Sequence, residues 1–503
     1  MDHLLLLILF VPTLAALVLL FLPNGENKLF RWFALVASLI PLALSLYAWF
    51  NFDTTQSGFQ FEKSYVWYEA ISSSLHLGAD GLSLTMVLLT TLLTPLAILA
   101  SFSITDRVKP YMMLFLFLET GMLGVFMALD LLIFFVFWEV GLVPMYFLIN
   151  QWGSANRNYA SLKFLIYTMG GSLGLLLAIQ MLGVLFGNYD LINIYQGWNS
   201  LDPNKTLLGL PVPTVKAIAF WAFTIAFAVK VPVWPFHTWL PDAHTEAPTA
   251  GSMILAGVLL KLGAYGFLRL ILPLYPNEAK IFAGALAVLA TAAIVFGALA
   301  SYAQTDFKRL VAYSSVNHMG FVVLGIAAAG LSAGTLDANI ALNGAILQMF
   351  NHGLSAAGMF FLVGVIYERT HTRNLNEFGG LFPLVPVYGG LLIFTSMASL
   401  GLPGLNGFIS EFLVVRGSWP ILPVYTAIAL LGLLFTGAYI LKGIKMVLHG
   451  PLNEHWAHGE HKLTEINTRE IIVMVPLMAL ILWIGIWPAW ILDVINKAVV
   501  RLF

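Results

Sequence analysis

The sequence predicts an all-α polytopic membrane protein with about 14 transmembrane helices, because it is rich in apolar residues, poor in charge and built from long apolar runs. Hydrophobic residues make up 59% of the 503 residues and charged residues only 10%, whereas soluble domains carry about 25% charged residues. The mean hydropathy is +0.87. A crossing takes about 20 apolar residues, so the spans fill most of the chain and leave little for a soluble domain.

Apolar runs of suitable length follow one another from end to end. The first run has no basic start and exceeds the length of a signal-peptide core, so we interpret it as a helix and not as a leader. Gly and Pro interrupt two of the runs, near 230 and near 403, and predict broken helices. The expected spans are 4–22, 30–50, 82–102, 111–129, 131–150, 162–187, 214–232, 248–272, 280–301, 308–330, 339–367, 388–415, 421–447 and 470–492.

Lys and Arg are unevenly divided between alternate loops, which sets the expected orientation. Of the 24 such residues, 14 fall on one side, 8 on the other, and Lys230 and Lys261 lie inside spans. The richer side should be cytoplasmic, which places both termini on the outer side. We therefore expect a multi-pass protein of the bacterial cytoplasmic (inner) membrane.

The spacing of titratable residues indicates an internal repeat. Glu139 precedes Lys230 by 91 residues, and His318 precedes Glu411 by 93. A shift of about 180 residues maps one set onto the other, and interrupted spans in two corresponding halves are typical of repeat-built transporters. The predicted parts are N-terminal helices 1–110, a first repeat 111–272, a second repeat 280–447, and a charged loop with one C-terminal helix, 448–503.

Six ionisable residues within the spans are the candidate site, because a charge inside a bilayer is costly and normally faces the bundle interior or a water-filled route. Two acids, two lysines and two histidines form a set that can take up and release protons. Structural alternatives stay open, namely an ion pair that only ties two helices, histidines that are simple interhelical hydrogen bonders, and a bis-histidine haem. The six are Glu139, Lys230, Lys261, His318, His352 and Glu411.

The stretch "AFAVKVPVWPFHTWLPDAH" combines a lysine with a helix break. Pro232 and Pro235 follow Lys230 closely, so we expect the half-helix to end there with free carbonyl groups. These carbonyls and the negative end of the helix dipole would face the ammonium group. Moving the Glu139 carboxylate toward or away from Lys230 would then change how readily the lysine gives up a proton.

Four long motifs stand out in the sequence. They are "FFVFWEVGLVPMYFLI", "FAVKVPVWPFHTWLPDAHTEAPTAGSMILAGVLLKLGAYGFLRL", "AQTDFKRLVAYSSVNHMGFV" and "NHGLSAAGMFFLVGVIYERTHTRNLNEFGGL". Together they resemble the antiporter-like membrane subunits of the proton-pumping NADH:quinone oxidoreductase, respiratory complex I, over roughly residues 75–450. Glu411, the loop "HTEAPTAGS" and the absence of a long lateral helix after the last span resemble the M-type (chain 4) members.

The resemblance implies a role for each of the six residues. It assigns Glu139 and Lys230 as an ion pair in a first half-channel, Lys261 as the central proton carrier and Glu411 as the terminal group of a second half-channel. The two histidines resemble the relay between Lys261 and Glu411. The chain would thus translocate protons as one subunit of the oxidoreductase.

The resemblance also implies which molecules surround the chain. Its partners would be other membrane subunits of complex I, especially the L-type and N-type antiporter-like subunits, and membrane lipids, with no nucleic acid. The chain has no cysteine and cannot hold a cysteine-ligated cluster. We expect no cofactor or redox centre in this chain, and flavin, iron–sulfur clusters and quinone in other subunits. A subunit of a multi-component cation/proton antiporter and a passive scaffold remain alternatives.

Loop residues give weaker hypotheses. Asp130, at a span edge, is either an aid to proton movement or a solvated helix cap. Asp242, His244 and Glu246 in "PDAHTEAP" could bind a metal, although their spacing matches no zinc pattern. The stretch "NEHWAHGEHK", 453–462, has three histidines in a loop, where adventitious metal binding is the expectation.

Overall fold

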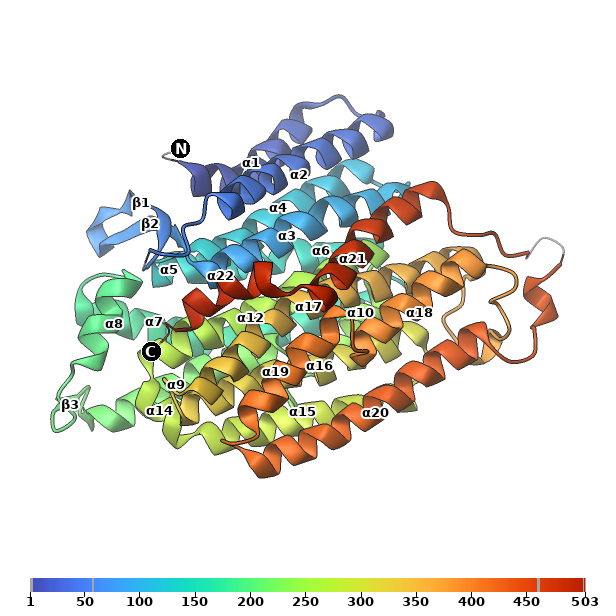
Figure 1. Ribbon diagram of the computed structural model, residues 1–503. Helices are drawn as coiled ribbons and strands as arrows, with labels where there is room; N and C mark the ends of the chain where they lie inside the picture. Colours follow the sequence, from blue (N-terminus) through green and yellow to red (C-terminus); the bar gives the residue numbers. More distant parts are fainter. Residues whose placement is uncertain (1–2, 57, 459–461, 501, 503) are drawn as a thin grey trace.

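Long helices running between two ends of the molecule make up the fold (Figure 1). The computed structural model describes residues 3–56, 58–458, 462–500 and 502. Within these residues, 13 helices are long and apolar enough to cross a membrane, and a further span is divided into two shorter helices, Pro386–Leu400 and Asn406–Ser418. Each corresponds to a predicted span with edges that differ by a few residues, so the predicted fold class is confirmed.

The first half of the chain contains the N-terminal helices and the first broken span. Its elements are α1 (Leu4–Phe21), α2 (Asn27–Phe50), β1 (Gln60–Tyr68), β2 (Ser73–Ala79), α3 (Gly81–Ala100), α4 (Val108–Met127), α5 (Leu131–Val140), α6 (Leu142–Trp152), α7 (Arg157–Phe186), α8 (Leu191–Asn199), β3 (Thr206–Leu207), β4 (Leu210–Pro211), α9 (Val212–Lys230) and α10 (Trp239–Glu246).

The second half begins with a fully buried span made of several consecutive segments. Its elements are α11 (Thr249–Ile254), η3 (Leu255–Leu259), α12 (Leu260–Gly266), η4 (Phe267–Ile271), α13 (Leu272–Leu274), α14 (Pro276–Ile281), α15 (Ala283–Ala303), α16 (Phe307–Leu331), α17 (Leu336–Thr370), α18 (Pro386–Leu400), α19 (Asn406–Ser418), α20 (Pro423–Leu448), α21 (Thr468–Ile486) and α22 (Ala489–Val499).

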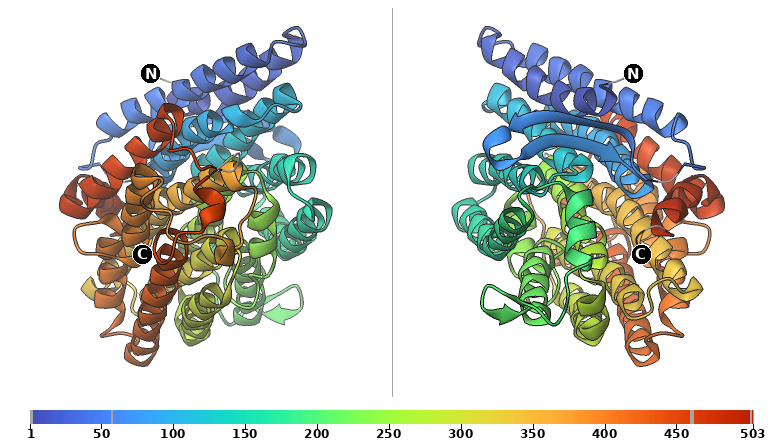
Figure 2. Two further views of the ribbon diagram at one scale, coloured as in Figure 1. Left: turned by 90° about the vertical axis from the view of Figure 1, so that its right-hand side faces the viewer. Right: turned by 90° about the vertical axis from the view of Figure 1, so that its left-hand side faces the viewer.

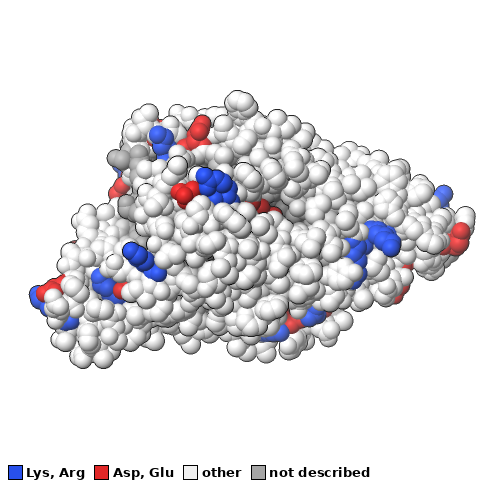
Figure 3. Space-filling model, turned by 60° about the horizontal axis from the view of Figure 1, so that its bottom comes forward, with Lys and Arg blue, Asp and Glu red and all other residues white. Residues whose placement is uncertain are grey.

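The two ends of the bundle differ. One end carries the antiparallel hairpin β1–β2 and the short helix α8, and we call it the hairpin end (Figure 2, right panel). The opposite end carries the described segments 449–458 and 462–467, and we call it the loop end (Figure 1). Charged side chains lie in small separate groups on the face drawn in Figure 3, with uncharged surface between them. Such a surface suits a chain that lies mostly in lipid.

Two predicted segments have more structure than expected. The loop 51–80 contains the hairpin β1–β2, whose strands pair from Gln60 with Ala79 to Tyr68 with Ser73. The single helix expected at the C-terminus is two helices, α21 and α22, that are separated at Trp487 and Pro488. A proline in the interior of a helix removes a backbone hydrogen bond and clashes with the preceding turn, which explains the interruption.

Both predicted helix breaks are present. The first, 231–238, separates α9 from α10, and the second, 401–405, separates α18 from α19. At the second break Gly401 and Gly404 have φ angles of +83° and +93°, a left-handed backbone region that favours glycine. The broken span is the fourth of five in each predicted repeat, although the division of the chain into these parts remains a prediction.

The buried span 249–274 crosses the middle of the bundle. Two π-helical segments, η3 and η4, interrupt its α-helical hydrogen bonding on either side of Lys261. Single π-turns inside helices are frequent at functional sites because they change the direction of the side chains around them. The span therefore presents Lys261 from a short α-helical segment with an irregular turn on each side.

Helix α21 packs directly on the second break. A Cβ atom added to Gly485 would lie 2.2 Å from the carbonyl oxygen of Gly404 and 2.4 Å from the Cα of Leu405. Small residues allow such close backbone approach between helices in membranes. Gly485 thus fixes the position of the break that precedes Glu411.

Replacing Gly485 with valine should destabilise the protein, because the added side chain must push α21 away from the break. Overpacking of this kind costs about 1–3 kcal/mol, so the thermal unfolding midpoint of the purified protein should fall. The matched control is Gly390→Val, since a Cβ at Gly390 meets no atom within 4 Å. Equal midpoints for the two variants would contradict the packing argument.

Candidate functional site

Lys261 occupies the centre of the candidate site. Its side chain is fully buried, and its ammonium group donates to the carbonyl oxygen of Ala256 at 2.5 Å and to Nδ1 of His352 at 2.7 Å. The first bond exists because η3 leaves the Ala256 carbonyl within reach of the lysine. Both partners are uncharged acceptors when His352 is neutral, and within the described part of the chain no carboxylate lies in ion-pair contact with this ammonium group.

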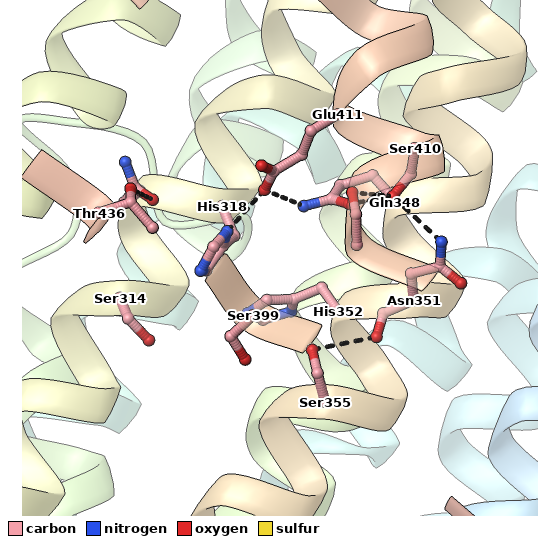
Figure 4. Close-up of polar contacts among 12 residues, drawn as sticks. Ser314, His318, Gln348, Asn351, His352, Ser355, Ser399, Ser410, Glu411 and Thr436 are labelled. Atoms are coloured by element: carbon pink, nitrogen blue, oxygen red, sulfur yellow. Dashed lines mark hydrogen bonds and ion pairs between the residues drawn. The ribbon is translucent and has the colours of Figure 1, made fainter. Parts of the chain in front are cut away.

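His318 and Glu411 form the second half of the same group (Figure 4). Nδ1 of His318 donates to Oε1 of Glu411 at 2.7 Å, and the same oxygen accepts a bond from Nε2 of Gln348 at 3.0 Å. Nε2 of His318 lies 3.1 Å from the hydroxyl of Tyr439. Both ring nitrogens of His318 therefore have protein partners, which disfavours the haem alternative raised from the sequence.

A small gap separates the two histidines. The ring centroids of His318 and His352 are 5.7 Å apart. A cavity of about 10 Å³ lies between them and is lined also by Gln348, Asn351 and Glu411. This is close to the space that one water molecule needs, and the lining supplies polar partners for it. One water would join the Lys261–His352 pair to the His318–Glu411 pair.

Amide and hydroxyl groups hold this arrangement in place (Figure 4). Asn351 on α17 donates to the carbonyl of Asn406 at 2.7 Å and to Oγ of Ser410 at 3.0 Å. Ser410 in turn donates to Oε1 of Gln348 at 2.5 Å. The start of α19, just after the second break, is thereby tied to α17, so Glu411 and His352 keep their relative position.

Glu139 and Lys230 do not form the direct ion pair that was expected from the sequence. Among the described residues no nitrogen–oxygen contact within 4.0 Å joins the two side chains. The Lys230 ammonium lies 4.7 Å from the ring centroid of Trp138, and Oε1 of Glu139 is buried without a hydrogen-bond partner. The aromatic face of Trp138 takes the place of direct contact between the ammonium group and the carboxylate.

The expectation of free carbonyl groups beside Lys230 is wrong for two carbonyl groups near the end of α9. The carbonyl of Ala228 accepts from the backbone N–H of Val233 at 2.7 Å, and that of Val229 accepts from the indole N–H of Trp239 at 2.8 Å. The chain satisfies these groups itself because unpaired backbone is costly in the bundle interior. The break places Lys230 but does not solvate it with these carbonyls.

Buried ionisable side chains outside the six candidates include Glu119 and Arg269, which the sequence reasoning missed, and His244, which it considered only as part of a metal site. Glu119 on α4 is fully buried, and neither of its carboxylate oxygens has a hydrogen-bond partner. Its signal was an acid within the apolar run 111–129. Arg269 is buried in η4 and bonds Asp80 at 2.6 Å. His244 stacks on Phe360 with a centroid distance of 4.3 Å, and both its ring nitrogens lack partners.

The residues suggested as a metal site do not converge. Asp242 pairs with Lys163 at 2.6 Å and with Arg309 at 3.2 Å. Glu246 accepts from the backbone N–H of Asn156, while His244 stacks on an aromatic ring. Each side chain is used separately to join helices. The histidine-bearing stretch 453–462 lies partly outside the described residues, which lack 459–461.

Asp130 caps the start of α5. The sequence-based alternative of a solvated cap is wrong in one respect, because the Asp130 side chain is buried. Its Oδ1 accepts from the N–H groups of Leu132 and Ile133 at the start of α5, and its Oδ2 accepts from Ser73 and Ser74 of the hairpin. Burial raises the pKa of Asp130 above its usual value, although these hydrogen bonds act in the opposite direction.

A second titratable group lies at the hairpin end, outside the spans. His76 is 2.9 Å from Glu62 and 2.7 Å from Asp190. Burial alone would lower the pKa of His76, but the hydrogen bonds with the two carboxylates outweigh it and raise the pKa above the usual value. Burial would raise the pKa of Asp190, but the hydrogen bond from His76 lowers it overall.

Comparison with known proteins identifies one family. The model described as "NADH:quinone oxidoreductase/Mrp antiporter, TM" matches residues 128–436. The chain is 39% identical over 508 residues to NADH-quinone oxidoreductase subunit M of Rhodobacter capsulatus, and the match covers 100% of this chain and 96% of that protein.

Solved structures agree with this match. A chain of respiratory complex I from Thermus thermophilus with bound NADH is 27% identical, with a TM-score of 0.84 and coverage of 99% of both chains. A chain of the Mrp complex from Dietzia sp. DQ12-45-1b has a TM-score of 0.82 at 24% identity and covers 98% of this chain and 52% of that one. The second likeness concerns the fold alone.

The hairpin end should become less stable as the pH rises. A raised pKa means that protonated His76 favours the folded hairpin, so its contribution is complete below the usual pKa of 6.5 and is lost as the pH passes the raised value. Amide exchange of β2, corrected for its intrinsic pH dependence, should speed up over that range and lose this dependence in His76→Gln. An unchanged pH dependence in the variant would contradict the assignment.

Proposed function

The chain belongs to the family of NADH:quinone oxidoreductase and Mrp antiporter membrane proteins, and on that premise we propose that its buried row of lysine, histidine and glutamate side chains carries protons. The chain is a multi-pass, proton-translocating membrane subunit of an NADH:quinone oxidoreductase. The observation that supports the proposed route is the row of two buried hydrogen-bonded pairs, Lys261–His352 and His318–Glu411, with a water-sized cavity lined by both histidines between them.

Each step of the route is a proton transfer between groups in contact or one water apart. Lys261 gives a proton to Nδ1 of His352, and His352 releases its Nε2 proton to the water between the histidines. From there the proton reaches the His318–Glu411 pair, whose bond to Gln348 holds the carboxylate in position. Lys261 is left neutral, which removes the cost of its buried charge.

In this scheme Lys230 returns a proton to Lys261 after Lys261 has lost its own. The position of the Glu139 carboxylate determines how readily Lys230 gives up that proton. With the carboxylate held away from the ammonium group, as here, the Trp138 ring is the close partner of the buried Lys230 charge among the residues that the structure describes. Because a buried charge without a counter-ion is costly, this geometry favours release of the proton. Approach of Glu139 would favour its uptake again.

A cation/proton antiporter subunit is the second candidate, since the family model covers both kinds of protein. The greater identity to subunit M, 39% against 24% for the Mrp chain, favours the oxidoreductase. Glu411 is the terminal group of the route in either case. Proton pumping driven by NADH oxidation, and not by an imposed cation gradient, distinguishes the two.

The surroundings of the chain follow from the same proposal. The subunit lies among other membrane subunits of the complex, with the L-type and N-type antiporter-like subunits as neighbours. It resides in the bacterial cytoplasmic membrane with the loop end inside and both termini outside. Flavin, iron–sulfur clusters and quinone belong to other subunits, consistent with a chain that has no cysteine.

Lys261 should be essential for coupled turnover because it is the only lysine among the four residues of the proposed route, Lys261, His352, His318 and Glu411. In the assembled complex, Lys261→Met should lower the NADH:quinone activity of coupled membranes by roughly tenfold or more, equivalent to a barrier increase of at least about 1.4 kcal/mol. Lys261→Arg should assemble and still transfer protons poorly, since arginine hardly deprotonates. Wild-type turnover of Lys261→Met would rule out an obligatory carrier.

Glu139→Gln and Lys230→Ala separate a proton carrier from a passive scaffold. Both changes should lower the proton-to-electron ratio, because the first removes the controlling charge and the second removes the group that recharges Lys261. The ratio is measured in proteoliposomes together with the rate of NADH oxidation. A normal ratio and rate in both variants would favour the scaffold.

A further inference from the structure

A cavity of about 400 Å³ lies at the hairpin end, outside the proposed proton route. Segments that are far apart in the sequence form its wall, including the start of β1, the start of α3, α8, the end of the buried span 249–274 and α22. Small-molecule sites in proteins have volumes of about 300–1,000 Å³, so this cavity has the size of a binding site. Its charged lining residues are Glu62, Asp80, Arg269 and Lys497.

Arg269 has hydrogen-bond donors that the protein does not use. Nε donates to the hydroxyl of Tyr265 at 3.1 Å, and Nη2 donates to Asp80 at 2.6 Å and to Ser83 at 3.2 Å. Over the described ranges of the chain, Nη1 has no hydrogen-bond partner, although the side chain is only 5% exposed. The guanidinium carbon lies 4.9 Å from the ring centroid of Phe59, which packs against it. A buried, oriented guanidinium with two free N–H groups is suited to binding an oxygen anion.

Two other charged side chains at the wall also have unused binding capacity. Lys497 on α22 is exposed, and its ammonium group has no ion-pair or hydrogen-bond partner in the part of the chain that the structure describes. Glu62 on β1 uses Oε1 for its contact with His76 at 2.9 Å, which leaves Oε2 for a further donor. The Glu62 side chain is 43% exposed. The cavity therefore offers a cationic side and one carboxylate acceptor.

The charge balance of the wall favours a ligand with one negative and one positive group. Asp80 balances the charge of Arg269, whereas Lys497 has no counter-ion. A ligand with both charges would satisfy Lys497 and Oε2 of Glu62 at once. A bare anion would instead be repelled by the Glu62 carboxylate, because like charges at close range raise the energy of binding.

The depth of the charged groups indicates how such a ligand would be oriented. Arg269 belongs to the buried span, while Glu62 belongs to the hairpin that projects from the bundle. A negative group would thus bind deeper in the membrane, and a positive group nearer to water (Figure 2, right panel). A phospholipid has this order when its phosphate carries an outer ammonium group. Phe52 and Leu502 add apolar surface to the wall for the rest of the molecule.

We propose that the hairpin-end cavity binds the headgroup of a zwitterionic phospholipid. The phosphate accepts hydrogen bonds from Nη1 of Arg269 and from Lys497, and the ammonium group donates to Oε2 of Glu62. Bound in this way, the lipid joins α22 to the hairpin and to the end of the buried span. The site goes beyond the proposed function, because none of these three side chains belongs to the proton route.

Hydrogen exchange of the whole complex tests the site with short-chain phosphatidylethanolamine as the probe. The lipid-stripped complex in detergent is titrated with this probe, and the amides of β1, α8 and α22 should exchange more slowly as it binds. Short-chain phosphatidylglycerol, which has a phosphate but no ammonium group, should give the same protection only at several-fold higher concentration. Inorganic phosphate alone should give none. Equal protection by all three probes would overturn the proposal.

Lys497→Gln is the main variant, because Lys497 has no protein partner to lose. It should raise the concentration of phosphatidylethanolamine at half-maximal protection several-fold and leave exchange without lipid unchanged. Arg269→Lys keeps a cation beside Asp80 but removes the guanidinium fork, so it should weaken binding as well. The matched control is Lys280→Gln, since Lys280 on α14 is exposed and does not line the cavity. This control should behave as the wild type.

Glu62→Gln tests the ammonium half of the site separately. It should remove the preference for phosphatidylethanolamine, so that the two lipids protect at similar concentrations. Wild-type protection by phosphatidylethanolamine in both Lys497→Gln and Glu62→Gln would overturn the proposal. Binding is measured without NADH oxidation, so the result does not depend on whether the chain moves protons.

Discussion

The burial of the Lys261 ammonium group is the constraint on which the rest of the site depends. A charge at the centre of a membrane bundle is costly unless it finds polar partners, and over the described ranges of the chain the Lys261 ammonium group hydrogen-bonds to the Ala256 carbonyl and the His352 ring alone. Neither can neutralise it. The lysine can therefore lose its proton at low cost when an acceptor is in contact, and His352 is that acceptor. The hydrogen bonds among Asn351, Ser410 and Gln348 fix the position of the next acceptor, the His318–Glu411 pair.

The two helix breaks serve this constraint in different ways. At the first break, the backbone and Trp239 use the carbonyl groups that would otherwise face Lys230, so the lysine keeps few stabilising contacts. At the second break, left-handed glycines let α19 start beside α17, and Glu411 gains a firm hydrogen-bonded position. The charge on Lys230 has few stabilising contacts, whereas the Glu411 carboxylate is held by hydrogen bonds. This difference favours proton transfer from the lysine toward the glutamate.

Much of the fold and the core of the site could be predicted from the sequence, because membrane spans have a strong length and hydropathy signal. The same signal makes charges such as Lys261 and Glu411 stand out. Glu119 carried that signal too and was overlooked. Arg269 could not be placed, since its burial depends on the π-helical turn η4 and on Asp80, 189 residues earlier. The separation of Glu139 from Lys230 depends on where Trp138 packs, which spacing along the chain does not specify.

The water between the histidines tests the central claim most directly. The proposed route requires a proton to cross from His352 to the His318–Glu411 pair through the cavity between the two histidines, whose ring centroids are 5.7 Å apart. An experimental structure of the whole complex with resolved water should show an ordered water in contact with both rings and with the Glu411 side of the cavity. A dry cavity closed by apolar side chains, with the same histidine positions, would contradict the route.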